Sequence, residues 1–226
     1  MNRNLFFTPT NILLPAHADM RRWSVIACDQ FTADAGYWQA VQDTVGDAPS
    51  TLRLMLPEFY LGKCDEAAAT REIQQTMRRY LDDGVFRTVP HSLVLVQRTL
   101  PGGTVRCGIV GALDLEAYDY APDSVTPIRA TEGTVASRLP ARVRIRAAAA
   151  LEMPHIMVFY SDPEDTIRRE AQAAAGETLY DFDLMSGGGH VRGLRIAGAK
   201  ADALAARLCV TGVGTDGAHP MRFAIA

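Results

Sequence analysis

The sequence lacks the compact motifs that identify most common enzyme classes. It contains neither a Gly-x-Ser-x-Gly element nor a His-Glu-x-x-His element, so nothing supports a serine hydrolase or a common zinc protease. Gly212-Val-Gly-Thr-Asp-Gly217 follows an expected helix instead of joining a strand to a helix, which excludes the dinucleotide-binding fingerprint. Ser186-Gly-Gly-Gly189 lacks the lysine and hydroxyl residue that complete a P-loop. We interpret it as a hairpin tip, with a backbone cradle for phosphate as the alternative.

The chain also has few cysteines and no long apolar run. Its four cysteines are widely scattered and form no Cys-x-x-Cys pair, so neither a zinc site nor a thioredoxin-like motif is supported. No apolar stretch approaches the ~18 residues of a membrane span, and the N-terminal apolar stretch is too short for a secretory signal. We expect a cytoplasmic protein with reduced thiols that does not bind a membrane.

What the chain does have is a local cluster of arginine. Hydrophobic residues make up 48% of the chain and charged residues 22%, as in globular proteins with a core. The formal net charge is −3, yet residues 129–146 contain five arginines and one glutamate. Because a long polyanion would need a broader basic face, this local cluster suits a small anion and makes nucleic acid an unfavourable partner.

Periodicity and end signals predict four helices. The clearest covers residues 65–82, where Ile73, Met77 and Tyr80 recur at three- and four-residue steps. The other three are a helix capped by Thr32 or Asp34 that ends near Gly46, one that begins at Ser161 or Asp162, and an alanine-rich one over residues 199–208.

Apolar and β-branched runs predict the strands. One hairpin joins residues 93–96 to 105–115 through Pro101-Gly-Gly103, and a second joins residues 178–184 to 190–196. Further strands are expected over residues 23–28, 154–160 and 221–226, the last of which looks unfinished. The fold class is therefore α/β or α+β, with mixed β-sheet and packed helices, and a sub-boundary is expected near residues 116–128.

The arginine segment has two interpretations. Arginine forks match carboxylate and phosphate oxygens two at a time, so Arg129 and Arg138 could hold a phosphate while Thr131 and Thr134 add hydrogen bonds. Glu132 would then orient an arginine or act as a base. Alternatively, the arginines at 142, 144 and 146 alternate along the exposed face of a strand and pair with surface acids.

Asp29 and Gln30 form a second candidate site. They follow the expected strand over residues 23–28 directly, and ligands favour the carboxyl ends of strands in open α/β sheets. Asp29 could hold a metal ion or activate a hydroxyl group there. It could equally cap the next helix.

Several segments together resemble the domain-of-unknown-function-1015 family. The resemblance runs from near residue 11 to near residue 220, with its segments in order. The segments are Leu13-Leu-Pro15, Trp23-Ser-Val-Ile-Ala-Cys-Asp-Gln-Phe31, Tyr37-Trp38, Gly46-Asp-Ala-Pro-Ser-Thr-Leu52, Arg98-Thr-Leu100, Gly111-Ala-Leu-Asp-Leu-Glu116, Ile128-Arg-Ala-Thr-Glu-Gly-Thr134, Arg138-Leu-Pro-Ala-Arg142 and Pro154-His-Ile-Met157.

The resemblance implies a longer protein, of which residues 1–226 are the N-terminal portion. Family members continue into a Gly-Asp-Gly motif similar to one in the ParB/sulfiredoxin-like superfamily, where it helps to bind nucleotide phosphates. That element is expected to be incomplete here. The residues that match the family's polar motifs are Asp29, Gln30, Arg129, Thr131, Glu132, Thr134 and Arg138, and Arg142 is the next candidate.

The function implied is that of a nucleotide-dependent phosphotransferase, a kinase for a small metabolite or an amino acid, active when full length. Asp29 and Glu132 would be catalytic, and Gln30, Arg129, Thr131, Thr134, Arg138 and Arg142 would bind phosphate or nucleotide. The expected cofactor is ATP or ADP with Mg²⁺, and the expected partners are a small anionic ligand or nucleotide and a second copy in a homodimer. The alternatives are a ParB-like nucleotide-binding regulator without turnover and an inactive truncated scaffold.

Overall fold

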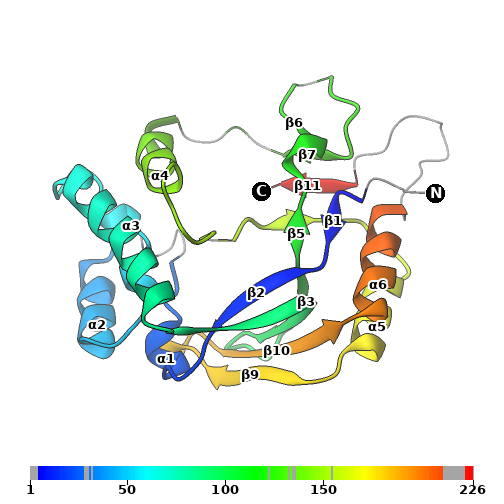
Figure 1. Ribbon diagram of the computed structural model, residues 1–226, viewed down its shortest axis with the longest axis horizontal. Helices are drawn as coiled ribbons and strands as arrows, with labels where there is room; N and C mark the ends of the chain where they lie inside the picture. Colours follow the sequence, from blue (N-terminus) through cyan, green and yellow to red (C-terminus); the bar gives the residue numbers. More distant parts are fainter. Residues whose placement is uncertain are drawn as a thin grey trace.

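The computed structural model describes residues 5–27, 31, 33–121, 123–131, 133, 136–153, 155–210 and 222–225, with the side chains of Arg138 and Val210 left out. Within these residues, helices and three β-sheets are combined, which confirms the predicted class (Figure 1). None of the described helices is long and apolar enough to cross a membrane. The helices are α1 (Met20–Trp23), α2 (Ala35–Val45), α3 (Glu66–Asp82), α4 (Leu139–Arg146), α5 (Thr166–Ala174) and α6 (Ala199–Val210).

The largest sheet is antiparallel and is built on one long strand. β3 (Phe86–Thr99) pairs on one side with β10 (His190–Ala197), which in turn pairs with β9 (Thr178–Asp183). The other side of β3 is shared by β2 (Thr10–Pro15) along its first half and β4 (Val105–Val110) along its second half. β3–β4 and β9–β10 are the two hairpins that the turn residues predict, and both are confirmed.

A smaller sheet lies across the core from the first one. Its strand order is β6-β7-β11-β8, where β6 (Tyr118–Asp119), β7 (Ile128–Ala130) and β11 (Phe223–Ile225) are parallel. β8 (Val158–Phe159) is antiparallel to β11. The strand β11 therefore pairs with a neighbour on each side. A two-stranded pair, β1 (Phe7–Thr8) with β5 (Ala112–Leu113), lies beside them (Figure 1).

One hydrophobic core joins the two sheets. Leu93 and Leu95 of β3 pack in the same buried cluster as Ile128 of β7 and Phe223 of β11. The helices α5 and α6 close this cluster at one end (Figure 1). Phe223 also makes edge-to-face contacts with Phe6 and Phe7, at centroid distances of 5.4 and 5.9 Å. Because strands from both sheets contribute to one core, the small sheet is held firmly against the large one.

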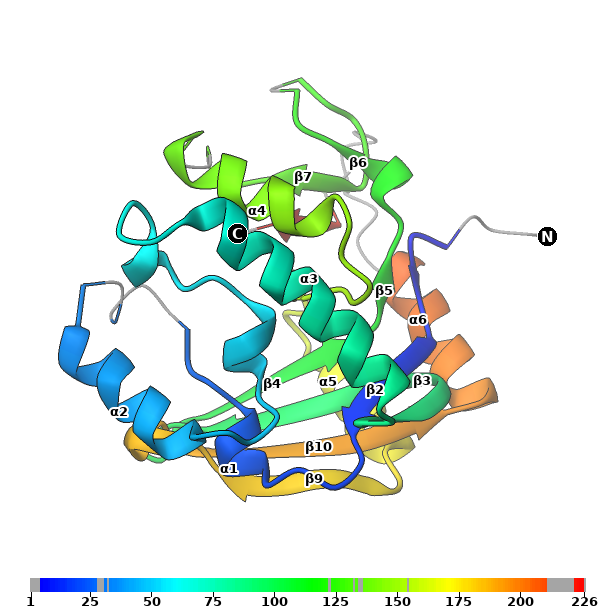
Figure 2. The same cartoon turned by 60° about the vertical axis from the view of Figure 1, so that its left-hand side comes forward.

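A second group of helices packs at the other end of the molecule (Figure 2). The predicted helices there are confirmed: Asp34 caps α2 by accepting the Tyr37 N–H at 2.9 Å, and Gly46 ends it with a φ of 53°. Asp65 caps α3 by accepting the Ala67 and Ala68 N–H groups. The start and end of α2 and the start of α3 therefore follow directly from the local sequence.

The predicted strand over residues 23–28 is wrong. Trp23 ends α1, and residues 24–27 form no strand. The Trp23 carbonyl accepts hydrogen bonds from the hydroxyl groups of Ser50 and Thr51, at 3.2 and 2.8 Å, instead of from a neighbouring strand. The indole ring of Trp23 is buried against Tyr80 and Phe86. Long-range contacts therefore override the local β propensity of this segment.

The predicted strand face of alternating arginines is also wrong, because that segment is helix α4. Ala141 and Ile145, four residues apart, form its buried side, and Ile145 packs against α3. Two other elements are displaced. The strand expected over residues 154–160 is reduced to β8, and the helix expected from residue 161 or 162 begins at Thr166.

Candidate functional site

The structure describes only part of the predicted site. Asp29, Gln30, Glu132 and Thr134 lie outside the described residues, and Arg138 is described only as the last residue of the 3-10 turn η5 (Ala136–Arg138). Arg129, Thr131 and Arg142 are described in full. The other 3-10 turns are η2 (Thr51–Leu54), η3 (Glu58–Tyr60), η4 (Leu115–Ala117) and η6 (Met185–Gly187).

The arginine segment leaves the small sheet at the carboxyl edge of its parallel strands. β6, β7 and β11 run in the same direction, so their carboxyl ends meet at one edge. Thr131 follows β7 directly. Its N–H and its hydroxyl group both donate to the Ile225 carbonyl of β11, at 3.0 and 2.8 Å. Ligands favour the carboxyl ends of strands in such sheets. We expected this of Asp29, but in the structure the segment after β7 occupies such a position.

Arg129 lies in the middle of this sheet. It is the register partner of Asp119 in β6 and of Ala224 in β11. Its Nε donates to the Thr126 carbonyl at 2.9 Å, and the Thr126 hydroxyl group donates to the Ile128 carbonyl at 3.0 Å. The guanidinium group is therefore anchored by the loop that precedes its own strand.

The loop after β6 lies beside the loop after β7. The Asp119 carboxylate accepts the Ala121 N–H at 3.0 Å, and this bond, with help from the Ser124 hydroxyl group, lowers the pKa of Asp119. The next residue, Tyr120, is 61% exposed. A Cβ atom added to Gly133 would lie 3.6 Å from the Tyr120 hydroxyl oxygen, so the hydroxyl end of this side chain lies beside Gly133.

The arginines of α4 are engaged elsewhere. Arg142 bonds Glu58 at 2.8 Å, Arg144 bonds Glu66 at 2.5 Å and Arg146 bonds Glu152 at 2.6 Å. The alternative that these three arginines pair with surface acids is therefore confirmed, on a helix instead of a strand. Arg142 is therefore directed to Glu58, and among the described residues no hydrogen bond or ion pair joins it to Thr131.

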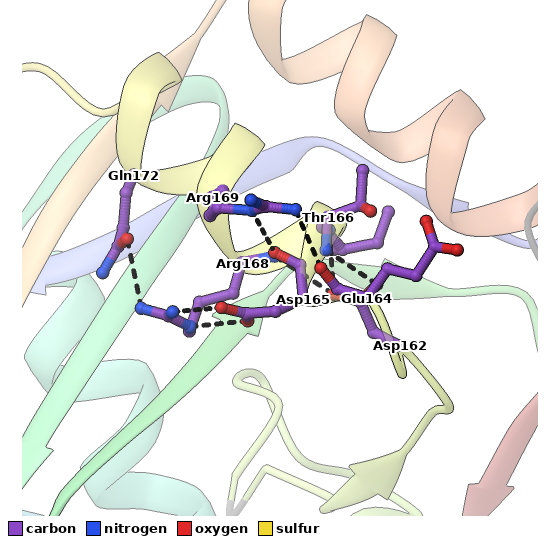
Figure 3. A network of polar contacts seen from close by, with 8 residues as sticks. Asp162, Glu164, Asp165, Thr166, Arg168, Arg169 and Gln172 are labelled. Carbon is purple, nitrogen blue, oxygen red and sulfur yellow. Dashed lines mark hydrogen bonds and ion pairs between the residues drawn. The ribbon is translucent and has the colours of Figure 1, made fainter.

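A separate polar network lies at the start of α5 (Figure 3). Three of its residues, Asp162, Asp165 and Arg168, line a pocket of about 210 Å³ together with residues of β4. The Asp162 carboxylate accepts the N–H groups of Thr166 and Ile167, at 3.0 and 2.8 Å. Asp165, which has a φ of 55°, forms a two-bond pair with Arg168, and this pair lowers the pKa of Asp165. These carboxylates are satisfied within the protein, so the network caps α5.

This network was not predicted from the sequence, because the end signals place the start of the helix at Ser161 or Asp162 instead of Thr166. The local signal was present: acids at positions 162 and 165 precede an arginine at 168, three residues after the second acid. Asp162 does cap the helix, but from four residues before its first residue. Among the described residues, no group of three or more His, Cys, Asp or Glu side chains could hold a metal ion.

Comparisons with known proteins give one match. No curated protein and no solved structure matches the chain. The model of the family described as "Protein of unknown function (DUF1015)" matches residues 8–226, nearly the whole chain, and the predicted resemblance is thereby confirmed. The chain belongs to the DUF1015 family.

Proposed function

We propose that the protein is a nucleotide-dependent phosphotransferase, a kinase for a small hydroxyl-bearing metabolite such as an amino acid. The observation that carries the proposal is the position of the segment after β7. It leaves the carboxyl edge of three parallel strands and continues into the helical residues of η5 and α4. A strand, a loop and a helix in this order give backbone N–H groups that face a bound phosphate.

The residue types at this edge suit phosphate. Arg129 carries a planar guanidinium group anchored through its Nε, and a guanidinium group can offer paired N–H donors to phosphate oxygens. The Thr131 hydroxyl group and N–H are already used to join β7 to β11. In this proposal Thr131 therefore shapes the edge, and the following residues of the loop contact the ligand.

Tyr120 supports a nucleotide over free phosphate. Its ring is exposed beside Gly133, and aromatic side chains stack on nucleobases with an energy of about 1–3 kcal/mol per base. Mg²⁺ would arrive with ATP or ADP, because nucleotide phosphates usually supply several of its ligands. The proposal assumes a cytoplasmic protein, where ATP is available.

Calorimetric titration with ATP, ADP and inorganic phosphate, each with and without Mg²⁺, tests the proposal. We expect saturable binding of a nucleotide. Arg129→Gln should weaken it about tenfold or more, since a hydrogen bond to a charged group contributes roughly 1.5–3 kcal/mol. Arg144→Gln is the matched control, because Arg144 of α4 is paired with Glu66 of α3. A folded wild-type protein that binds none of these ligands would overturn the proposal.

A second measurement separates a kinase from a regulator. Incubation with γ-labelled ATP and a mixture of hydroxyl amino acids should yield a labelled product if phosphoryl transfer occurs. Nucleotide binding without transfer to any acceptor would favour the ParB-like, non-catalytic alternative. A salt-sensitive complex with DNA would add to that alternative.

A further inference from the structure

The hairpin of β9 and β10 carries a histidine held between two carboxylates. His190, the first residue of β10, contacts Asp183 through Nδ1 at 2.8 Å and Asp181 through Nε2 at 2.6 Å. Both aspartates belong to β9, and His190 is the register partner of Asp183. The imidazole ring therefore bridges two positions of the neighbouring strand, at the end where the Gly-rich tip begins.

This arrangement requires a particular protonation state. A neutral imidazole has one N–H group, so it can donate to only one of the two carboxylates. Its other nitrogen would then direct a lone pair at a carboxylate oxygen less than 3 Å away. Only the imidazolium form donates to Asp181 and Asp183 together.

The surrounding charges keep both aspartates in place. Arg192 of β10 lies 3.4 Å from Asp181, and Arg21 of α1 lies 3.2 Å from Asp183. Arg98 of β3 donates to the Gly188 carbonyl at 3.3 Å. The charged groups around His190 are thus two carboxylates on β9 and arginines from α1, β3 and β10. Because arginines hold both aspartates in place, the group in this cluster whose protonation changes with pH is His190.

The tip of the hairpin, which precedes His190, contains residues in left-handed backbone conformations. Ser186, Gly187 and Gly189 have φ values of 54°, 67° and 91°. A Cβ atom on Gly189 would lie 2.1 Å from the Thr99 carbonyl oxygen. Left-handed conformations cost free energy for a residue such as serine and need support from their surroundings.

A pocket of about 310 Å³ lies directly against this anchor. Its wall includes Asp183 and His190 themselves, together with Gly187 and Gly189 of the tip and Thr99 and Leu100 at the end of β3. Any change in the cluster of His190 therefore changes the wall of the pocket.

We propose that His190, Asp181 and Asp183 form a pH-sensitive latch that holds the Gly-rich tip and shapes the adjacent pocket. The latch is closed when His190 is an imidazolium. When the proton leaves, one carboxylate keeps its arginine but loses the imidazole N–H as a donor, and the tip and the pocket wall loosen. The latch does not depend on the proposed kinase activity, because it lies on the large antiparallel sheet and uses none of the residues at the β7 edge.

The pH range in which the latch opens follows from the direction in which the pKa of His190 is shifted. Hydrogen bonds first to Asp183 and then to Asp181 raise the pKa of His190 above its ordinary value of 6.5. A group whose pKa is raised on folding contributes stability that is fully present below the unfolded value and is lost as the pH rises through the folded value. The latch therefore opens on the alkaline side of pH 6.5.

NMR titration of the histidine ring protons tests the latch. We expect His190 to titrate above pH 6.5 in the wild-type protein and lower in Asp181→Asn and Asp183→Asn. Amide exchange at Gly187, Gly188 and Gly189 should accelerate beyond its intrinsic pH dependence as His190 titrates. In His190→Gln this additional acceleration should be absent.

His91 is the internal control, since it contacts a single carboxylate, Asp202, at 2.8 Å. His91→Gln should leave exchange at the tip unchanged. Two results would overturn the latch. One is a pKa of His190 at its ordinary value, and the other is amide exchange at the tip that does not change as His190 titrates. Both measurements use the folded wild-type chain, so they remain decisive even if one aspartate variant folds poorly.

Discussion

Thr131 donates two hydrogen bonds to one acceptor, the carbonyl oxygen of Ile225. The N–H group lies at 3.0 Å and the hydroxyl oxygen at 2.8 Å from that oxygen. Two residues from distant parts of the chain thereby join β7 to β11 at the edge where we propose that phosphate binds. The contact explains why a threonine stands here: its hydroxyl group continues the pairing of the strands past their last residues.

Thr131→Val should therefore reduce the free energy of unfolding by about 1 kcal/mol, the usual contribution of one hydrogen bond. Urea denaturation measures this loss. Thr131→Ser keeps the hydroxyl group and should retain most of the stability. Equal losses for valine and serine would show that the methyl group, and not the hydroxyl group, is what matters at this position.

Gly193 should not tolerate a side chain. A Cβ atom there would lie 2.2 Å from Cζ of Tyr180, whose ring covers the glycine from the neighbouring strand. Burial of this ring also raises the pKa of Tyr180 to about 12. Because the ring must move, Gly193→Ala should cost roughly 1–3 kcal/mol, measured as a lower denaturation midpoint.

Gly108→Ala is the matched control for that change. Gly108 and Gly193 are both register partners of Val96, one on each side of β3. A Cβ atom on Gly108 has no atom within 4 Å. Alanine at position 108 should therefore be neutral or stabilising by about 0.4–1 kcal/mol, through the smaller entropy of its unfolded chain. Similar effects at both glycines would contradict the role of Tyr180.

Asp162→Ala should destabilise the protein by about 1 kcal/mol, because it removes the acceptor for the first N–H groups of α5. Thermal denaturation measures the change. Glu164→Ala is the control, since Glu164 is exposed in the same loop and its backbone carbonyl, not its carboxylate, accepts from Arg169. If the two variants behave alike, the Asp162 cap contributes little.

Arg142→Gln should have a small effect on both stability and ligand affinity. Its pair with Glu58 joins α4 to η3 near the surface, and such pairs typically contribute about 0–1 kcal/mol. We expect nucleotide affinity to change less than about twofold in calorimetry. A loss as large as that of Arg129→Gln would mean that Arg142 leaves Glu58 to contact the ligand.

Local sequence determined the elements whose signals act within a few residues. Asp34 and Asp65 cap α2 and α3 because a short carboxylate can accept the first N–H groups of its own helix. The turns Pro101-Gly-Gly103 and Ser186-Gly-Gly-Gly189 produce the predicted hairpins because glycine adopts left-handed conformations at low cost. The family could also be recognised from such short segments, and nearly the whole chain matches it.

Only the tertiary structure decided the elements whose partners lie far along the chain. The segment after Trp23 has strand propensity, but the hydroxyl groups of Ser50 and Thr51 occupy the Trp23 carbonyl. The alternating arginines form a helix, because α3 buries Ile145 and glutamates from three other segments neutralise their charge. The parallel pairing of β7 with β11 depends on a core shared by both sheets. Local propensity carries no information about such partners, so the sequence by itself yielded the arginine motif, and the fold decided which strand edge it occupies.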